Sequence, residues 1–173
     1  AIKDEKLNSD LSVVLAPDMG SVKMSQGYAK NLGMNFAIID KRRYAPNKTQ
    51  VSHLIGELNN RDVLIIDDMI DTAGTLVNAA KAAFEKGARS VIAIATHGVL
   101  SGKAIKRLEK SQINKIIITD TIEMANEKRI DKLKIVSVSK VFSEAVNRIH
   151  KGESVSALFE FQKGDWLNVI NVL

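Results

Sequence analysis

The stretch DVLIIDDMIDTAGTLVNAAKAAFEKGA, residues 62–88, passes from an apolar run through an acidic turn into an amphipathic segment. The apolar run predicts a buried strand over residues 62–67, with its end at Ile66. Gly87 lies where a helix commonly ends. One face of the helix predicted over residues 76–88 carries Leu76, Ala79, Ala80, Ala83 and Phe84. A strand that leads through a turn into a helix is the building unit of an α/β fold.

The same alternation continues on both sides of this unit. Strands are predicted at 11–16, 36–40, 51–58, 90–96, 114–120 and 134–139, and helices at 21–33, 102–111 and 141–152. Apolar strands that alternate with helices predict an α/β fold: a mainly parallel, twisted sheet flanked by helices on both faces. We expect the last helix to close the core. We assign residues 1–160 to one domain and residues 161–173 to an apolar tail, either an edge strand or a partner-binding segment.

Composition narrows the classes of function. A chain of 173 residues with net charge +5 is long enough for one domain with a core, and it suits anionic ligands. Only 5% of its residues are aromatic and its longest basic cluster is residues 41–43, so we expect no nucleic-acid partner. The absence of cysteine favours a reducing, cytoplasmic location. No apolar run approaches 18 residues, so we expect no membrane span.

Ligands of parallel α/β sheets bind beyond the carboxyl ends of the strands, which directs attention to loops 17–24, 40–50, 67–75 and 96–102. In the third of these, the small residues TAGT precede a helix, and such a turn binds an anion through backbone N–H groups and the helix dipole. The aspartates of the same loop suit ribose hydroxyls. A sugar phosphate suits both parts of the loop, with its phosphate at the TAGT turn and its hydroxyls at the aspartates. In the alternative, Asp71 and Thr75 are capping residues and Asp67 and Asp68 are solvated.

The segment VLIIDDMIDTAGT resembles the phosphoribosyl-diphosphate-binding segment of ribose-phosphate diphosphokinases, the PRPP synthetases. Four further stretches agree with that family in order and spacing: AIIDKRR (37–43), ATHGVLSG (95–102), IITDT (117–121) and RIHKGESVSALF (148–159). The resemblance extends from about Leu11 to Phe159 and concerns the carboxy-terminal half of the family's chains. It implies a fold like that of type I phosphoribosyltransferases.

The resemblance also implies a reaction, the transfer of the diphosphoryl group of ATP to the 1-hydroxyl of ribose 5-phosphate with Mg²⁺. Lys41 and Arg43 match the family's two functional cations, which stabilise negative charge on the migrating group. Asp67, Asp68 and Asp71 would lie near the sugar hydroxyls. The 5-phosphate would bind at Thr72, Ala73, Gly74 and Thr75.

The family's diphosphate loop reads Asp-x-Gly-Gly-x-x-Arg, and this chain departs from it with DMGSVKM at residues 18–24. Asp18 and Gly20 match, and Asp18 is the candidate magnesium ligand. A serine replaces the second glycine, and Met24 stands where the arginine is expected. Lys23, one position earlier, is the available cation.

The resemblance further implies partners. Ser154 and Ser156 would belong to an allosteric site for phosphate or ADP at a subunit interface of a homo-oligomer. In that family an amino-terminal domain supplies most of the ATP site, and we expect this sequence to correspond to the carboxy-terminal half alone. We therefore expect the chain alone to bind ribose phosphate weakly and to transfer diphosphate inefficiently.

Two other functions stay open. A phosphoribosyltransferase would share the 67–75 loop, although the Lys-Arg-Arg loop, the Gly-Glu-Ser-Val-Ser stretch and the lack of an obvious nucleobase hood argue against it. A non-catalytic, synthetase-associated regulatory subunit would account for the altered diphosphate loop.

Overall fold

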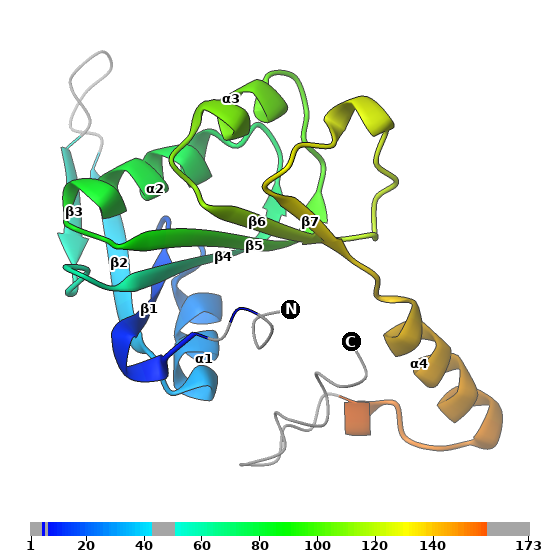
Figure 1. Cartoon of the computed structure of the whole chain (residues 1–173). Helices are drawn as coiled ribbons and strands as arrows, with labels where there is room; N and C mark the ends of the chain where they lie inside the picture. Colours follow the sequence, from blue (N-terminus) through cyan, green and yellow to red (C-terminus); the bar gives the residue numbers. More distant parts are fainter. Residues whose placement is uncertain (1–4, 6, 43–50, 159–173) are drawn as a thin grey trace.

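A seven-stranded sheet forms the centre of the computed structural model, which describes residue 5, residues 7–42 and residues 51–158 (Figure 1). The strand order is β3-β2-β1-β4-β5-β6-β7, and within the described ranges only β3 runs antiparallel to its neighbour. The strands are β1 Ser12–Ala16, β2 Asn35–Arg42, β3 Val51–Ile55, β4 Asp62–Ile70, β5 Ser90–Gly98, β6 Lys115–Thr119 and β7 Leu133–Val136. The predicted mainly parallel α/β fold is confirmed.

Helices cover both faces of this sheet. The α-helices are α1 Val22–Leu32, α2 Gly74–Glu85, α3 Ala104–Lys110 and α4 Ser139–Lys151, and short 3-10 turns lie at Ser9–Leu11, Asn126–Lys128 and Ser156–Leu158. Helix α1 packs on one face, and α2 and α3 pack on the other (Figure 1). None of the helices in the described ranges is long and apolar enough to cross a lipid bilayer.

The alternation of side chains along the central strands divides the core into two layers. Val13 and Leu15 of β1 belong to the larger cluster, under α2 and α3, whereas Val14 belongs to the cluster under α1. Residues on one strand point to opposite faces in turn, so a strand that is apolar at every position serves both layers. All five residues of β1 are buried, as this arrangement requires.

Helix α2 confirms the predicted packing face. The residues that it buries are Leu76, Ala79, Ala80 and Ala83. It begins two residues earlier than predicted, at Gly74, and ends at Glu85. Gly87 follows with φ +81°, and its neighbour Ala88 donates its N–H to the carbonyl of Ala83 at 3.1 Å. A glycine in this left-handed conformation is a common helix stop.

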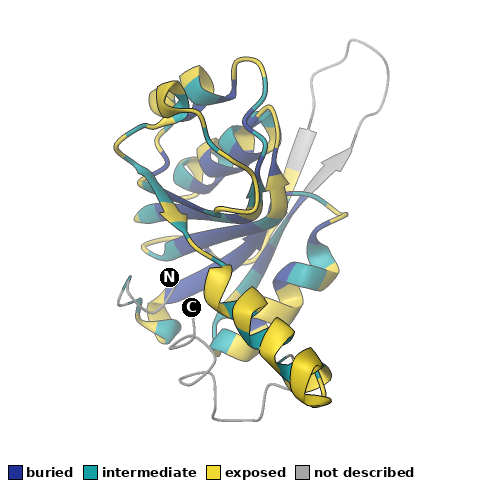
Figure 2. Cartoon of the chain, turned by 90° about the vertical axis from the view of Figure 1, so that its right-hand side faces the viewer, coloured by how far each residue is buried: buried dark blue, intermediate teal, exposed yellow. Residues whose placement is uncertain are grey.

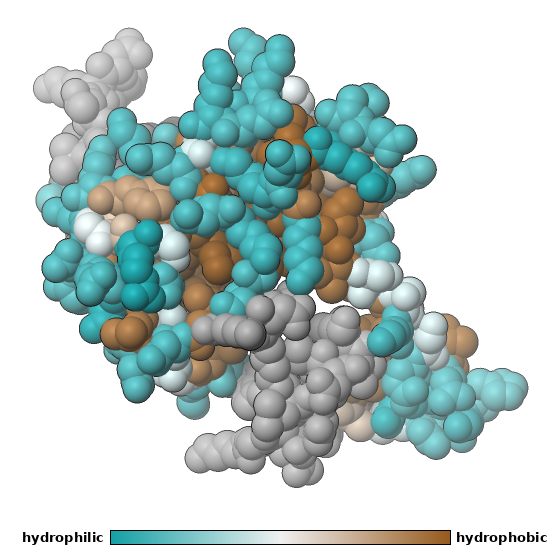
Figure 3. All heavy atoms as spheres, in the orientation of Figure 1, coloured by the Kyte–Doolittle hydropathy of each residue, from teal (hydrophilic) through white to brown (hydrophobic). Residues whose placement is uncertain are grey.

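The expectation that the last helix closes the core is wrong. Helix α4 buries none of its residues and extends away from the sheet (Figures 1 and 2). Its apolar side chains Phe142, Val146 and Ile149 are 63%, 65% and 67% exposed. Hydrophilic atoms cover much of the α4 end of the molecule, and hydrophobic atoms lie beside them (Figure 3). The amphipathic pattern identified a face that favours burial, but such a pattern does not specify the surface that covers it.

Candidate functional site

The candidate site begins on a strand that is longer than predicted. Strand β4 continues past Ile66 to Ile70, because its register with β5 extends to the pair Ile70 and Gly98. Asp67 and Asp68 are therefore strand residues with side chains on opposite faces. Asp67 is half-buried and Asp68 is exposed. The two carboxylates that the sequence placed in one loop have different surroundings.

Asp67 is the electrostatically perturbed group of the site. Burial raises its pKa from the usual 3.8 to about 6. The N–H of Asp68 donates to its Oδ1 at 2.9 Å and lowers the pKa, whereas the charges of Asp68 and Asp18 raise it further. Asp18, which follows β1, is thus within electrostatic reach of Asp67 on β4. The structure thus brings an acidic residue of the loop after β1 close to one on strand β4.

Asp18 is held in a compact turn before α1. Its Oδ1 accepts the N–H of Ser21 at 3.1 Å, and the Ser21 hydroxyl donates to the Asp18 carbonyl at 3.0 Å. A Cβ on Gly20 would lie 3.3 Å from the Asp18 Oδ1, so glycine leaves room for the carboxylate. The serine that replaces a family glycine therefore stabilises this turn. Lys23 is exposed on the first turn of α1.

Met24 has a structural role in place of the expected arginine. It is partly buried and packs against the cluster under α1, which includes Val14, Leu64 and Ile66. Because the side chain lies against the core, it contributes neither charge nor a hydrogen-bond donor to the adjoining loop. Lys23 is the only cation of the altered loop 18–24.

The turn after β4 exposes a row of backbone donors. Within the described ranges, the N–H groups of residues 72–75 donate no hydrogen bond. Ala73 has φ +60° and precedes α2, whose first N–H groups have no partner inside the helix. Thr72 and Thr75 are exposed and add two hydroxyl groups. Free N–H groups at a helix N-terminus, with hydroxyls beside them, can bind a phosphate.

Ser101 and Arg107 contact this turn, and the sequence did not identify either of them as a site residue. The Ser101 hydroxyl donates to Asp71 Oδ1, and Arg107 Nη1 donates to the Thr72 carbonyl at 2.8 Å. The rule that ligands bind beyond strand ends did point to loop 96–102, which contains Ser101. Arg107 lies on α3, and no local pattern distinguishes it from the neighbouring lysines.

Some of the predicted site residues lie outside the described residues. Lys41 belongs to β2, but its side chain is not among the described ones, and Arg43 lies outside the described ranges. Ser154 and Ser156 are exposed beyond the end of α4 that is distant from the sheet (Figure 1). The tail 161–173 also lies outside the described residues.

A magnesium ion at this site would need ligands from bound phosphates as well as from the protein. In the described part of the chain, no group of three or more His, Cys, Asp or Glu side chains is arranged to hold a metal ion. Mg²⁺ usually takes one or two carboxylates and completes its octahedron with substrate phosphates and water. Asp18 and Asp67 supply such carboxylates.

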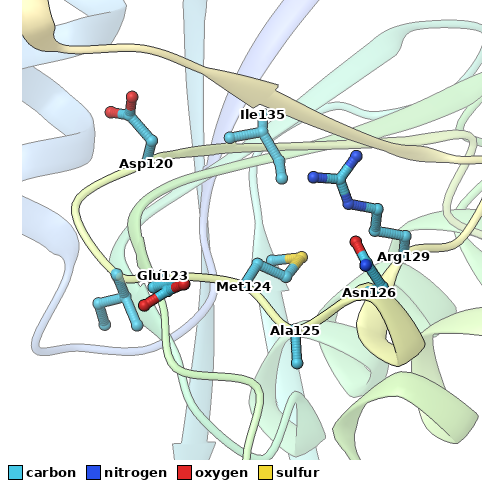
Figure 4. Close-up of a pocket in the computed structure, with 8 residues that line it drawn as sticks. Asp120, Glu123, Met124, Ala125, Asn126, Arg129 and Ile135 are labelled. Carbon is cyan, nitrogen blue, oxygen red and sulfur yellow. The ribbon is translucent and has the colours of Figure 1, made fainter.

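A separate hollow lies beside the ends of β6 and β7. It has a volume of about 570 Å³, and Met124, Arg129 and Ile135 face one another across it (Figure 4). Asp120 stands at its edge, where hydrogen bonds from the Ser137 hydroxyl and the Val138 N–H lower the pKa of its carboxyl. These bonds connect β6 to the start of α4, so Asp120 has a structural role.

Comparison with known proteins identifies the family of the chain. Residues 43–160 match the family described as the phosphoribosyl synthetase-associated domain. The chain is 50% identical over 156 residues to the ribose-phosphate pyrophosphokinase of Caldanaerobacter subterraneus subsp. tengcongensis, covering 90% of this chain and 49% of that protein. It is 46% identical over 147 residues to the enzyme of the same name from Aquifex aeolicus, covering 85% and 47%.

A solved structure gives the same result for the fold. The phosphoribosylpyrophosphate synthetase of Mycobacterium smegmatis superposes with a TM-score of 0.76 at 31% identity, covering 83% of this chain and 46% of that one. The chain spans about half the length of the curated relatives that it matches. With its β4–α2 turn and a family match over residues 43–160, the chain belongs to the phosphoribosyl synthetase-associated domain family.

Proposed function

We propose that this chain is the ribose-5-phosphate-binding half of a ribose-phosphate diphosphokinase. The observation that carries the proposal is the β4–α2 turn, where free N–H groups of residues 72–75 adjoin the carboxylates of Asp67, Asp68 and Asp71. The N–H groups would hold the 5-phosphate, and the carboxylates would accept hydrogen bonds from the ribose hydroxyls. One ligand with an anionic end and a hydroxylated end satisfies both sets.

The proposed reaction is the transfer of the diphosphoryl group of ATP to the 1-hydroxyl of the bound sugar. Lys41 and Arg43 would stabilise the negative charge that spreads over the migrating group. Asp18 and Asp67 would hold Mg²⁺, which neutralises charge on the phosphate oxygens. Gly20 and Lys23 belong to the loop that would hold the diphosphate.

The other half of the relatives' length is the partner that this chain would need. The relatives are about twice as long as the matched region, and the resemblance assigns most of the ATP site to their amino-terminal domain. The apolar side of α4, with Phe142, Val146 and Ile149 exposed, is a surface that such a domain would cover. We expect the isolated chain to bind the sugar phosphate without efficient transfer.

Titration calorimetry tests the proposal directly. The 173-residue chain is titrated with ribose 5-phosphate, and separately with ribose and with inorganic phosphate as controls for the two ends of the ligand. We expect saturable binding of ribose 5-phosphate that is tighter than that of either part, and weaker binding after Asp71→Asn. Equal affinity for ribose 5-phosphate and inorganic phosphate would refute the role of the carboxylates.

One observation favours a second candidate, a non-catalytic subunit that associates with a synthetase. Met24 packs in the core where the family's diphosphate loop has an arginine. Addition of the amino-terminal domain of a relative, with ATP and ribose 5-phosphate, separates the two candidates. Turnover would support the enzyme, and binding without turnover would support the associated subunit. Formation of a nucleotide from PRPP and a nucleobase, with release of diphosphate, would instead indicate a phosphoribosyltransferase.

A further inference from the structure

Three consecutive carbonyl groups at the end of β4 bond to a single neighbouring segment. The carbonyl oxygens of residues 70, 71 and 72 accept, in turn, the N–H of Leu100 at 3.0 Å, the N–H of Ser101 at 3.1 Å and Nη1 of Arg107 at 2.8 Å. Along a regular strand, successive carbonyls point to opposite sides and cannot share one neighbour in this way. The backbone of this turn is therefore rotated out of the strand pattern.

This rotation determines the direction of the N–H groups. In a trans peptide, the N–H points away from the carbonyl of the same peptide unit. The N–H groups of residues 71–73 therefore point away from the segment 100–107. Successive N–H groups on one side of a turn form a concave anion site. The contacts of Ser101 and Arg107 thus lie on the opposite side of the peptide groups from the place where an anion would bind.

The turn needs such support because its conformation is costly. Ala73 has φ +60° and is 5% exposed, and Leu100, opposite, has φ +50° and is 1% exposed. Residues with a Cβ disfavour this region, and they keep it where the surrounding contacts hold them there. The guanidinium of Arg107 donates to the carbonyl of Thr72, directly before Ala73, and so fixes the strained peptide between these two residues.

Ser101 acts on the sugar side of the same turn. Its hydroxyl donates to Asp71 Oδ1, and this bond leaves the second carboxylate oxygen of Asp71 for a ligand. A carboxylate held by one donor has a fixed direction, whereas the side chain alone rotates about two bonds.

We propose that Arg107 and Ser101 are positioning residues for ribose 5-phosphate, Arg107 for the phosphate end and Ser101 for the sugar end. This inference rests on the proposed function and deepens it. Arg107 acts through the backbone of residues 72 and 73, and its charge does not contact the ligand. Its effect is therefore distinct from that of the exposed lysines on the same helix.

The test compares Arg107→Ala, Arg107→Lys and Lys106→Ala in the 173-residue chain. Lys106 is the matched control, because it is an exposed cation one residue away on α3. Calorimetry gives the affinities for ribose 5-phosphate and inorganic phosphate, and amide NMR follows the signals of residues 71–75. Because Arg107→Ala removes a charge-assisted hydrogen bond, we expect it to lower the affinities for both ligands by about tenfold. Arg107→Lys should restore part of the loss, and Lys106→Ala should leave both affinities nearly unchanged.

Ser101→Ala provides an independent measurement on the other end of the ligand. It should lower the affinity for ribose 5-phosphate by several-fold and leave the affinity for inorganic phosphate unchanged, because inorganic phosphate has no sugar hydroxyl that reaches Asp71. Thermal unfolding of each variant shows whether the fold persists. A general loss of structure would weaken both ligands equally in the Ser101 and Arg107 variants, which would overturn the inference.

Three further outcomes show whether this inference fails alone or together with the proposed function. If the unaltered chain binds ribose 5-phosphate and Arg107→Ala binds it equally well, positioning by Arg107 is wrong and the proposed function stands. Equal losses in Lys106→Ala and Arg107→Ala would show that charge, not positioning, is responsible. If the unaltered chain shows no saturable binding, both proposals are overturned.

Discussion

Replacement of Asp67 by asparagine should stabilise the chain at neutral pH. Burial holds the pKa of Asp67 at about 6 instead of the usual 3.8. Each tenfold change in acidity corresponds to about 1.4 kcal/mol, which sets an upper bound of about 3 kcal/mol for the cost of the charge. The side chain is only half-buried, so water screens much of this, and we expect about 1 kcal/mol. An amide of the same shape keeps an oxygen that can accept the Asp68 N–H.

The gain should depend on pH in a defined direction. The folded-state pKa is raised, so the folded chain binds more protons than the unfolded chain between pH 3.8 and about 6. The stability of the unaltered chain therefore increases as the pH falls through this window. Asp67→Asn removes that dependence. The advantage of the variant should be complete above about pH 7 and should disappear towards about pH 4.

Thermal unfolding at several pH values measures both effects. A gain of about 1 kcal/mol raises the melting temperature of a chain of this size by about 2–4 °C. Asp131→Asn is the control, because Asp131 is exposed in a turn distant in sequence from the site. It removes the same charge without the burial. A melting temperature that falls in Asp67→Asn at neutral pH, or rises equally in Asp131→Asn, would refute the attribution to a buried charge.

Three further predictions concern the remainder of the fold. Asp62→Asn should lower stability by about 0.5 kcal/mol, as for a screened ion pair, because the side chain of Arg89 lowers the pKa of Asp62. A lowered folded-state pKa stabilises the chain above pH 3.8, so in acid titrations followed by circular dichroism the difference should narrow below that value. Leu108→Ala should cost about 2–5 kcal/mol in urea unfolding, because Leu108 is fully buried. Val146→Ser, on the exposed side of α4, should change stability by less than about 0.5 kcal/mol, and a larger loss would show that this face is covered in the isolated chain.

The sequence was sufficient to predict the sheet because its central strands contain continuous apolar runs, such as residues 63–66 in β4 and residues 91–95 in β5. Val13, Val14 and Leu15 are buried on alternating faces, and a short run that is apolar throughout indicates a strand covered on both faces. The sequence was insufficient to predict that α4 is exposed, because its pattern is as amphipathic as that of a core helix. Burial of Phe142 or Val146 depends on a surface that the described residues do not provide.

The candidate site also has some features that the sequence predicts and others that it does not. The acidic and small residues of 67–75 are contiguous, so their chemistry could be recognised locally. The contact between Arg107 and Thr72 joins positions 35 residues apart, and the approach of Asp18 to Asp67 joins the loop after β1 to strand β4. Such pairs arise from the order of strands in the sheet, with β1 beside β4 and β4 beside β5. Spacing along the chain carries no information about them.

Binding of the sugar phosphate and transfer of the diphosphoryl group therefore require different parts of the protein. The phosphate end would bind to backbone N–H groups that the loop after β5 and Arg107 of α3 hold in place, and all of these residues lie within the described ranges. Transfer of the diphosphoryl group would depend in addition on Asp18, on the cations at residues 41–43 and on a half of the relatives' length that this chain does not span. Binding of the sugar phosphate and transfer of diphosphate should consequently be separable. Substitutions at residues 71–75 or at Arg107 should weaken both, whereas those at Lys41 should leave binding intact and affect transfer alone.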